Sequence, residues 1–373
     1  MASLLMIHTG GTLVMERSTA SGALAADVTR DLLSELPVLN QIADIETLLL
    51  YRLDSADMQP EHWVQIAHVI HDRLTSYDGF VVVHGTDTMA YTASALAFLL
   101  RGLDRPVVLT GAQKPLSFVR TDARANLIDA CHVATLHIPE VAVAFHSRLF
   151  RGSRVTKLDA WGMNAFGSPC CPPLAELGLG VQLGPHVLPS RAPRPFDGRI
   201  EPRVLSVRTF PGLDPRLLLG ALGSGVRGMV IEAFGAGNVP RLERSLVPVI
   251  DSARAIDVPV VIVSQCPRGT VDLSAYEGGA AAARAGAIGA FDMTAEAALT
   301  KLMICLGQAP EGRVAAARAA FAEAWAGEVT FDLPSPPRSL LPPPPASYTG
   351  PPPRPSTKPP RGSGSTPPAS GEP

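Results

Sequence analysis

The chain has 373 residues, of which 46% are hydrophobic and 18% are charged, and its formal net charge is −2. A chain of this length can bury a sizeable core and is typical of two domains. The nearly balanced charge provides no basic surface, so we expect neither nucleic acid nor a membrane as a partner. A small molecule is the better candidate.

The first fifteen residues, MASLLMIHTGGTLVM, lack the charged start and the apolar run of a secretory signal, and the chain has no membrane-length apolar stretch. We therefore expect a cytoplasmic protein. The five cysteines form no C-x-x-C pair, which favours free thiols in a reducing compartment over a disulfide framework or a metal site.

Short apolar runs rich in β-branched residues alternate with longer segments of helical pattern, and this alternation predicts an α/β fold with parallel sheets. In chain order, strands are predicted at residues 3–9, 46–51, 79–84, 106–110, 141–145, 203–208, 228–233 and 258–264. Helices are predicted between them at residues 60–76, 88–101, 122–137, 241–256, 294–306 and 311–326.

Proline and glycine are dense in residues 168–202, and this stretch predicts the connection between two α/β domains. We place the domains at residues 1–183 and 203–334, with a linker at residues 184–202. Residues 335–373 hold 15 prolines in 39 positions without periodicity, so we expect a disordered, polyproline-like tail.

Polar residues follow several predicted strands, at the edge of a parallel sheet where ligands bind. These strand exits read TGGT at residues 9–12, HGTDT at residues 84–88 and TGAQ at residues 110–113. The segment LDSADM at residues 53–58 adds Asp54 and Ser55, and the segment RLFRGSRVTK at residues 148–157 ends in Lys157.

Taken singly, these motifs have simpler interpretations. The TGGT motif is typical of a loop, Thr86 and Asp87 of a helix N-terminus, and Lys157 of a solvated side chain. Taken together, they fit nucleophilic acyl transfer, because a threonine hydroxyl needs a base and a desolvated lysine can accept its proton. Backbone N–H groups at the glycine-rich exits would then hold the oxyanion.

Competing motifs do not fit their contexts. The glycine pattern of residues 223–228 precedes a predicted strand, whereas a dinucleotide fingerprint must follow one. No phosphate-binding P-loop and no G-x-S-x-G elbow occur in the chain. His62, His68 and His71 do not share one helix face with a carboxylate, so we predict no metal site.

The motifs resemble the bacterial-type L-asparaginase family, and most closely its cytosolic type I branch. The similar segments follow the order of the family along residues 3–330, and they are TGGT, LDSADM, HGTDTM, TGAQKP, RTDARANLIDA, RLFRGSRVTK, GAGN and DMTAEAALTKL. The resemblance implies a larger N-terminal and a smaller C-terminal α/β domain, and active sites completed across a close homodimer that usually pairs into a homotetramer.

The resemblance also implies a role for each matching residue. Thr12 would attack the side-chain amide of asparagine, and Thr86, Asp87 and Lys157 would form a second set that activates a nucleophile or water. The substrate's α-carboxylate and α-amino group would be held by Ser55 and Asp87, beside Asp54, Ala56, Thr86 and Ala112. No metal and no cofactor is implied, and the products would be aspartate and ammonia.

The chain departs from the family in two places. The family carries a tyrosine in the mobile loop after the first threonine, whereas residues 22–24 here are Gly, Ala and Leu, and no tyrosine occurs before Tyr51. Type I enzymes with an effector site for asparagine carry an arginine where this chain has Glu232, although Cys266 matches that site.

Two other functions remain open from the sequence. One is the amidase subunit of a tRNA-dependent amidotransferase, from which we would expect a further N-terminal domain and some basic surface. The other is a non-catalytic amino-acid sensor that kept the pocket. A sensor needs Asp87 but has no use for Lys157, so the presence of both favours the enzyme.

Overall fold

The computed structural model describes residues 1–11, 13, 15–17, 24–26 and 32–331. Three of the expectations above therefore stay predictions. Thr12 and the positions where the family has its loop tyrosine, residues 22 and 23, lie outside the described residues, as does the Pro-rich tail at 335–373. For Leu24, at the edge of the same loop, the structure describes only the backbone.

An eight-stranded sheet forms the N-terminal half, in the order β12-β11-β8-β7-β6-β5-β1-β4. Its strands are β1 (Ser3–Gly10), β4 (Asp44–Leu53), β5 (Gly79–Val83), β6 (Val107–Thr110), β7 (Val141–Phe145), β8 (Arg148–Arg151), β11 (Ala175–Leu177) and β12 (Val181–Leu183). The five neighbouring strands β4, β1, β5, β6 and β7 pair in parallel, as predicted. The remaining three extend the sheet in antiparallel fashion, which the sequence did not predict.

Helices cover both faces of this sheet. They are α1 (Leu32–Glu35), α2 (Pro60–His71), α3 (Met89–Leu99) and α4 (Ala123–Ala134). In β1, Leu5 and Ile7 belong to the cluster that includes α2 and α3, whereas Leu4 and Met6 pack in the cluster that includes α1 and α4. The central strands are buried on both sides, which explains their nearly continuous apolar sequences.

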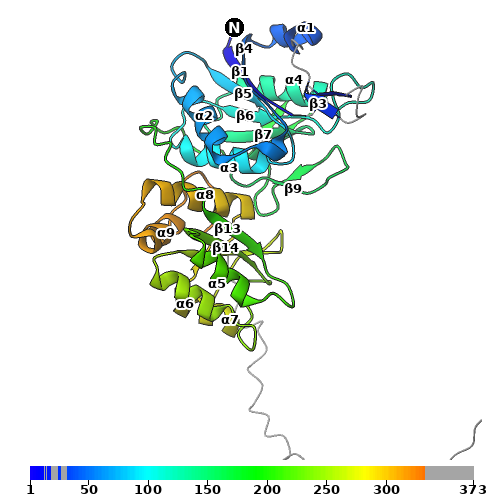
Figure 1. Ribbon diagram of the computed structural model, residues 1–373. Coiled ribbons are helices and arrows are strands. Elements are labelled where there is room, and N and C mark those ends of the chain that lie inside the picture. Colours follow the sequence, from blue (N-terminus) through cyan, green and yellow to red (C-terminus); the bar gives the residue numbers. More distant parts are fainter. Residues whose placement is uncertain (12, 14, 18–23, 27–31, 332–373) are drawn as a thin grey trace, which may run out of the picture. The chain divides into compact units, whose positions relative to one another are not determined.

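The C-terminal half holds a parallel sheet of four strands, in the order β13-β14-β15-β16. The strands are β13 (Val204–Arg208), β14 (Gly228–Ala233), β15 (Val260–Ser264) and β16 (Ile288–Gly289), and the helices are α5 (Pro215–Gly223), α6 (Val247–Ala255), α7 (Glu277–Ala285), α8 (Ala295–Gln308) and α9 (Arg313–Phe321). Helix α8 packs against α3 (Figure 1). One hydrophobic cluster runs through both halves.

Short elements complete the described chain. They are the paired strands β2 (Met15–Arg17) and β3 (Leu24–Ala26), the 3-10 helices η2 (Pro37–Gln41) and η3 (Ser55–Asp57), and the paired strands β9 (Thr156–Lys157) and β10 (Phe166–Gly167). No helix of the described residues is long and apolar enough to cross a membrane. All five cysteines lie in the described part and are free thiols, as predicted.

Several predicted helices are too long, and three observed helices, α1, α5 and α7, were missed. The predicted helix at 60–76 ends at His71, and the one at 241–256 begins only at Val247, where Pro248 fits the first turn. Helix α7 was missed because Gly278 and Gly279 disfavour a helix. A Cβ atom at Gly278 would lie 2.3 Å from the carbonyl oxygen of Val239, so close packing requires glycine at that position.

Candidate active site

Two glycines bring the exits of β1 and β5 into contact. Gly10 and Gly11 have φ angles of 107° and 88°, a region that glycine adopts without strain. A Cβ atom on Gly11 would lie 2.3 Å from the backbone nitrogen of Gly85, so no other residue fits there. In the sequence Gly11 precedes Thr12 and Gly85 precedes Thr86, so the contact joins the two predicted catalytic segments.

Thr86, Asp87 and Lys157 form one hydrogen-bonded set. The ammonium group of Lys157 donates to Thr86 Oγ1 over 2.8 Å and to Asp87 Oδ1 over 2.7 Å. Thr86 is 5% exposed, the Asp87 side chain is 66% exposed and that of Lys157 is 18% exposed. The set therefore leads from a buried hydroxyl to a carboxylate that faces solvent.

Separate elements deliver these three side chains. Thr86 and Asp87 lie between β5 and the first residue of α3, whereas Lys157 comes from β9, which pairs with β10. All three residues were predicted from the sequence, and the structure brings them together across 70 residues of chain.

The segment LDSADM lies beside this set, but its residues differ in their positions. Ser55 is buried, its carbonyl accepts a 2.7 Å hydrogen bond from the Thr88 hydroxyl, and a Cβ atom at Gly85 would lie 2.5 Å from its Oγ. Asp54 is exposed and accepts from the backbone N–H of Ala56, itself exposed, over 3.0 Å. The Asp54 carboxylate thus caps η3 within its own segment.

The exit of β6 is also close. A Cβ atom at Gly111 would lie 2.2 Å from the carbonyl oxygen of His84, and Ala112 after it is fully buried. Three neighbouring strands thus end against one another, as the sheet topology predicts.

His84 supports the exit of β5 from within the core. Its Nδ1 lies 2.7 Å from the carbonyl oxygen of Gly85, which can only accept, so Nδ1 carries the hydrogen. Its Nε2 therefore accepts from the Thr92 hydroxyl on α3, at 2.8 Å. Burial lowers the pKa of His84 to about 4, so the ring is neutral at physiological pH.

Gln113 is a site residue that the sequence analysis did not select. Its side-chain oxygen accepts a 3.1 Å hydrogen bond from the Thr86 hydroxyl, and its amide nitrogen donates to the carbonyl of Gly162 over 3.0 Å. The available signal was its position directly after Ala112, at a strand exit already chosen for its polar residues.

Family models match both halves of the chain. The model described as "Asparaginase, N-terminal" matches residues 3–186, and the model described as "Glutaminase/Asparaginase C-terminal domain" matches residues 203–321. The chain belongs to the asparaginase family.

Individual relatives agree with this assignment. The chain is 38% identical to L-asparaginase 1 of Escherichia coli, over 88% of this chain and 98% of that protein. It is similar to the solved structure of the thermostable L-asparaginase from Thermococcus kodakarensis, with a TM-score of 0.80 and 38% identity over 88% and 99% of the two chains. It is 36% identical to a glutamyl-tRNA(Gln) amidotransferase component of Pyrococcus abyssi, over 81% of this chain and 71% of that protein.

A separate cavity of this asparaginase-family chain lies behind Lys157. Its volume is about 260 Å³, and its lining includes Glu232, Cys266 and Glu296 together with Thr156, the residue before Lys157. The Thr156 hydroxyl donates to Glu296 Oε1 over 2.6 Å. Burial raises the pKa of the Glu296 carboxyl, and the nearby Glu232 raises it further. Glu232 and Cys266 thus share one cavity, as the resemblance implied.

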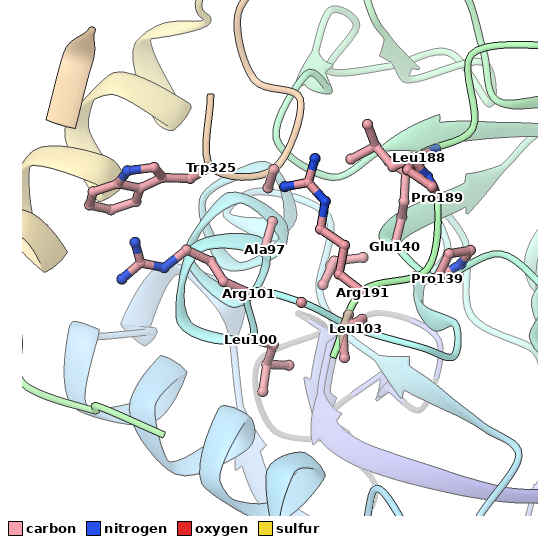
Figure 2. Close-up of a pocket in the computed structure, with 13 residues that line it drawn as sticks. Ala97, Leu100, Arg101, Leu103, Pro139, Glu140, Leu188, Pro189, Arg191 and Trp325 are labelled. Carbon is pink, nitrogen blue, oxygen red and sulfur yellow. The ribbon is translucent and has the colours of Figure 1, made fainter. Parts of the chain in front are cut away.

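Another cavity, of about 40 Å³, is distant from the catalytic residues. It lies at the far end of α3 from Thr86, next to Leu100 and Arg101. Figure 2 shows Arg101 beside Trp325, and the guanidinium carbon lies 4.1 Å from the ring centroid. An eleven-residue helix is roughly 16 Å long, so this cavity does not belong to the active site.

Proposed function

We propose that this chain is an L-asparaginase that hydrolyses the side-chain amide of L-asparagine, giving L-aspartate and ammonia. The observation that carries the proposal is the hydrogen-bonded set of Thr86, Lys157 and Asp87 at the carboxyl edge of the large sheet. Membership in the asparaginase family and the similarity to two L-asparaginases support it.

Thr12 is the proposed nucleophile, on the strength of its place in the TGGT motif. Its oxygen bonds to the amide carbon and forms a tetrahedral oxyanion, which backbone N–H groups at the glycine-rich exits hold. The C–N bond then breaks, and the nitrogen leaves as ammonia after gaining a proton. Water adds to the resulting ester, which releases aspartate and restores the threonine hydroxyl.

The set of Thr86, Lys157 and Asp87 moves the protons in this scheme. An ammonium group has no lone pair, so Lys157 must first give one proton to solvent, past the exposed Asp87, before it can accept a proton through Thr86. Asp87 then stabilises the ammonium that forms, 2.7 Å away. By the resemblance, the exposed carboxylate of Asp87 would also bind the α-ammonium group of the substrate, and Ser55 would bind its α-carboxylate.

Ammonia release from purified protein tests the proposal directly. We expect turnover of L-asparagine, with L-glutamine and simple aliphatic amides as comparison substrates. If asparagine binds in calorimetry but no ammonia appears, the chain is a sensor rather than an enzyme. If ammonia appears only when an amidotransferase partner and tRNA are added, the chain is the amidase subunit of that complex.

The resemblance extends the proposal to assembly. We propose that the enzyme is a homodimer or homotetramer in the cytoplasm and that a neighbouring subunit completes each site. Light scattering coupled to gel filtration measures the mass, and a monomeric mass at the concentration of the activity assay would contradict this part.

A further inference from the structure

Gln113 connects two parts of the site that are far apart in the sequence. Its side chain accepts from Thr86, which follows β5, and donates to Gly162, which lies in the loop between β9 and β10. Lys157 lies at the start of that loop and reaches the same Thr86 hydroxyl. One carboxamide therefore closes a ring of contacts that contains both the lysine and the threonine.

The orientation of this carboxamide follows from its partners. The backbone carbonyl of Gly162 can only accept, so the NH₂ end of Gln113 faces it and the oxygen end faces Thr86. Thr86 Oγ1 already accepts from the Lys157 ammonium, and the Gln113 oxygen cannot donate. The Thr86 hydrogen must therefore point at Gln113 and away from the lysine.

The backbone of Gln113 is fixed as well. The N–H groups of Gln113 and Lys114 donate to the two carboxylate oxygens of Asp122, over 2.9 Å and 3.0 Å. Asp122 is 7% exposed and also accepts from Asn126, over 3.1 Å. Because these bonds fix the main chain, they also fix the position from which the Gln113 side chain contacts Thr86.

The loop at the other end of the carboxamide is ordered by Asp159. The backbone N–H groups of Gly162 and Trp161 donate to its Oδ1, over 2.9 Å and 2.7 Å. These two bonds lower the pKa of the Asp159 carboxyl, and the nearby Lys157 adds to the effect. The loop is otherwise open to solvent, since Trp161 is 96% exposed and Leu158 is 58% exposed. Gln113 thus attaches an exposed hairpin to the buried end of the site.

We propose that Gln113 is a positioning residue that aims the Thr86 hydroxyl and holds the Lys157 hairpin against it. The carboxamide keeps the Thr86 hydrogen in a resting direction while Lys157 is an ammonium. When the lysine becomes a neutral amine, the hydrogen turns from the Gln113 oxygen to Nζ without a movement of the backbone. This inference rests on the proposed function, because it acts through Thr86 and Lys157.

The test compares Gln113→Met with the matched control Gln65→Met. Methionine has nearly the volume and length of glutamine but makes neither hydrogen bond. Gln65 is exposed on α2, where methionine suits a helix equally well, so Gln65→Met should behave like the parent. The measurements are kcat and KM for asparagine, the Kd of the product L-aspartate, and the melting temperature.

For Gln113→Met we expect kcat to fall at least about tenfold, as when an acid–base group loses its alignment. KM and the Kd of aspartate should stay within about threefold, and the melting temperature should stay within a few degrees. Hydrogen exchange in residues 158–165 should become faster, because Gly162 has lost its tie.

Two results would overturn the inference. One is a kcat within twofold of the parent, and the other is a fall in kcat accompanied by a matching rise in both KM and the Kd of aspartate. Lys157→Met, measured in parallel, separates the two proposals. If the parent releases no ammonia from asparagine, the proposed function itself fails. If Lys157→Met retains turnover, the role of Lys157 in proton transfer fails, whereas an inactive Lys157→Met beside a fully active Gln113→Met refutes only the role of Gln113.

Discussion

Glu232 makes the cavity behind Lys157 acidic. Burial raises the pKa of Tyr91, which lines this cavity, and the carboxylates of Glu296 and Glu232 raise it further. Both carboxylates therefore contribute negative charge to the cavity. The carboxylate of a second asparagine would be repelled there, because like charges a few ångströms apart cost energy at low effective dielectric.

We therefore predict hyperbolic saturation by asparagine, with no effector behaviour at this cavity. Initial rates over a wide range of asparagine concentrations check this prediction. A Hill coefficient well above one that falls to one in Glu232→Ala would show that the cavity does bind the substrate as an effector.

The buried His84 leads to a second prediction at the residue scale, about how the free energy of unfolding depends on pH. Its pKa is about 4 in the folded protein, because burial disfavours the charged ring, and about 6.5 when unfolded. The unfolded state therefore binds the proton first as the pH falls. The free energy of unfolding is therefore unaffected by His84 above about pH 6.5, and it decreases progressively as the pH falls from 6.5 toward 4.

At pH 5 this loss amounts to about 2 kcal/mol of unfolding free energy relative to pH 7.5. His84→Asn keeps a donor for the Gly85 carbonyl but cannot titrate, so its own free energy of unfolding should fall about 2 kcal/mol less than that of the parent over this range. Urea unfolding at the two pH values measures the difference. Parallel losses in both proteins would mean that another group carries the acid sensitivity.

At the scale of elements, the long buried strands could be predicted from the sequence, whereas the short strands and helix α7 could not. The buried parallel strands β1, β5, β6, β7, β14 and β15 were predicted to within a few residues, because apolar runs of four to eight residues have few alternatives. Strands β2, β3, β8 to β12 and β16 were missed, since each has only two to four residues and so carries too short a pattern to recognise. Helix α7 was missed because its two glycines are chosen by contacts with Asn238, Val239 and Leu273.

The same distinction holds for the site. Thr86, Asp87 and Lys157 could be selected because their residue types carry chemistry and because strand exits converge. Gln113 could not, since a glutamine gains its role only from the distances to Thr86 and Gly162, which no local pattern encodes.

The loop after Thr12 gives a prediction about an element. The loop has no tyrosine, and Ser18, Thr19 and Ser21 carry the only neutral hydroxyl groups between residues 13 and 28. We expect this enzyme to have a lower kcat than other members of the family, because a threonine without a polar neighbour is a poor nucleophile. Ala23→Tyr or Leu24→Tyr should raise kcat more than either changes KM, because the added hydrogen bond acts mainly in the transition state. If neither raises kcat, the loop has another partner for Thr12.

At the scale of the whole molecule, one buried ion pair and hydrogen bonds from Arg154 join the last described segment to both halves. Lys301 and Glu328 are fully buried and paired, and Arg154 donates to the carbonyl of Gly327 over 2.8 Å. Arg154 also pairs with the buried Asp292 at 2.9 Å. Arg154 also donates to the Thr330 hydroxyl over 2.7 Å, so the folded body needs the chain at least as far as residue 330.

A chain that ends at residue 334 should keep full activity and melting temperature, because the Pro-rich tail cannot form a core of its own. A chain that ends at residue 322 should be destabilised by at least about 3 kcal/mol, because Lys301 would be left buried without Glu328. Thermal melting of the two truncations checks both statements. Loss of stability in the longer one would show that the tail packs against the body.

The role of Lys157 is central to the account, because the proposed chemistry depends on its proton transfer through Thr86. The most direct measurement is the rate of ammonia release from asparagine by Lys157→Met, with Lys114→Met as the matched control on an exposed lysine of a neighbouring strand exit. We predict that Lys157→Met loses on the order of 10²- to 10⁴-fold in kcat while still binding aspartate, and that Lys114→Met matches the parent. Turnover by Lys157→Met within threefold of the parent would contradict the account.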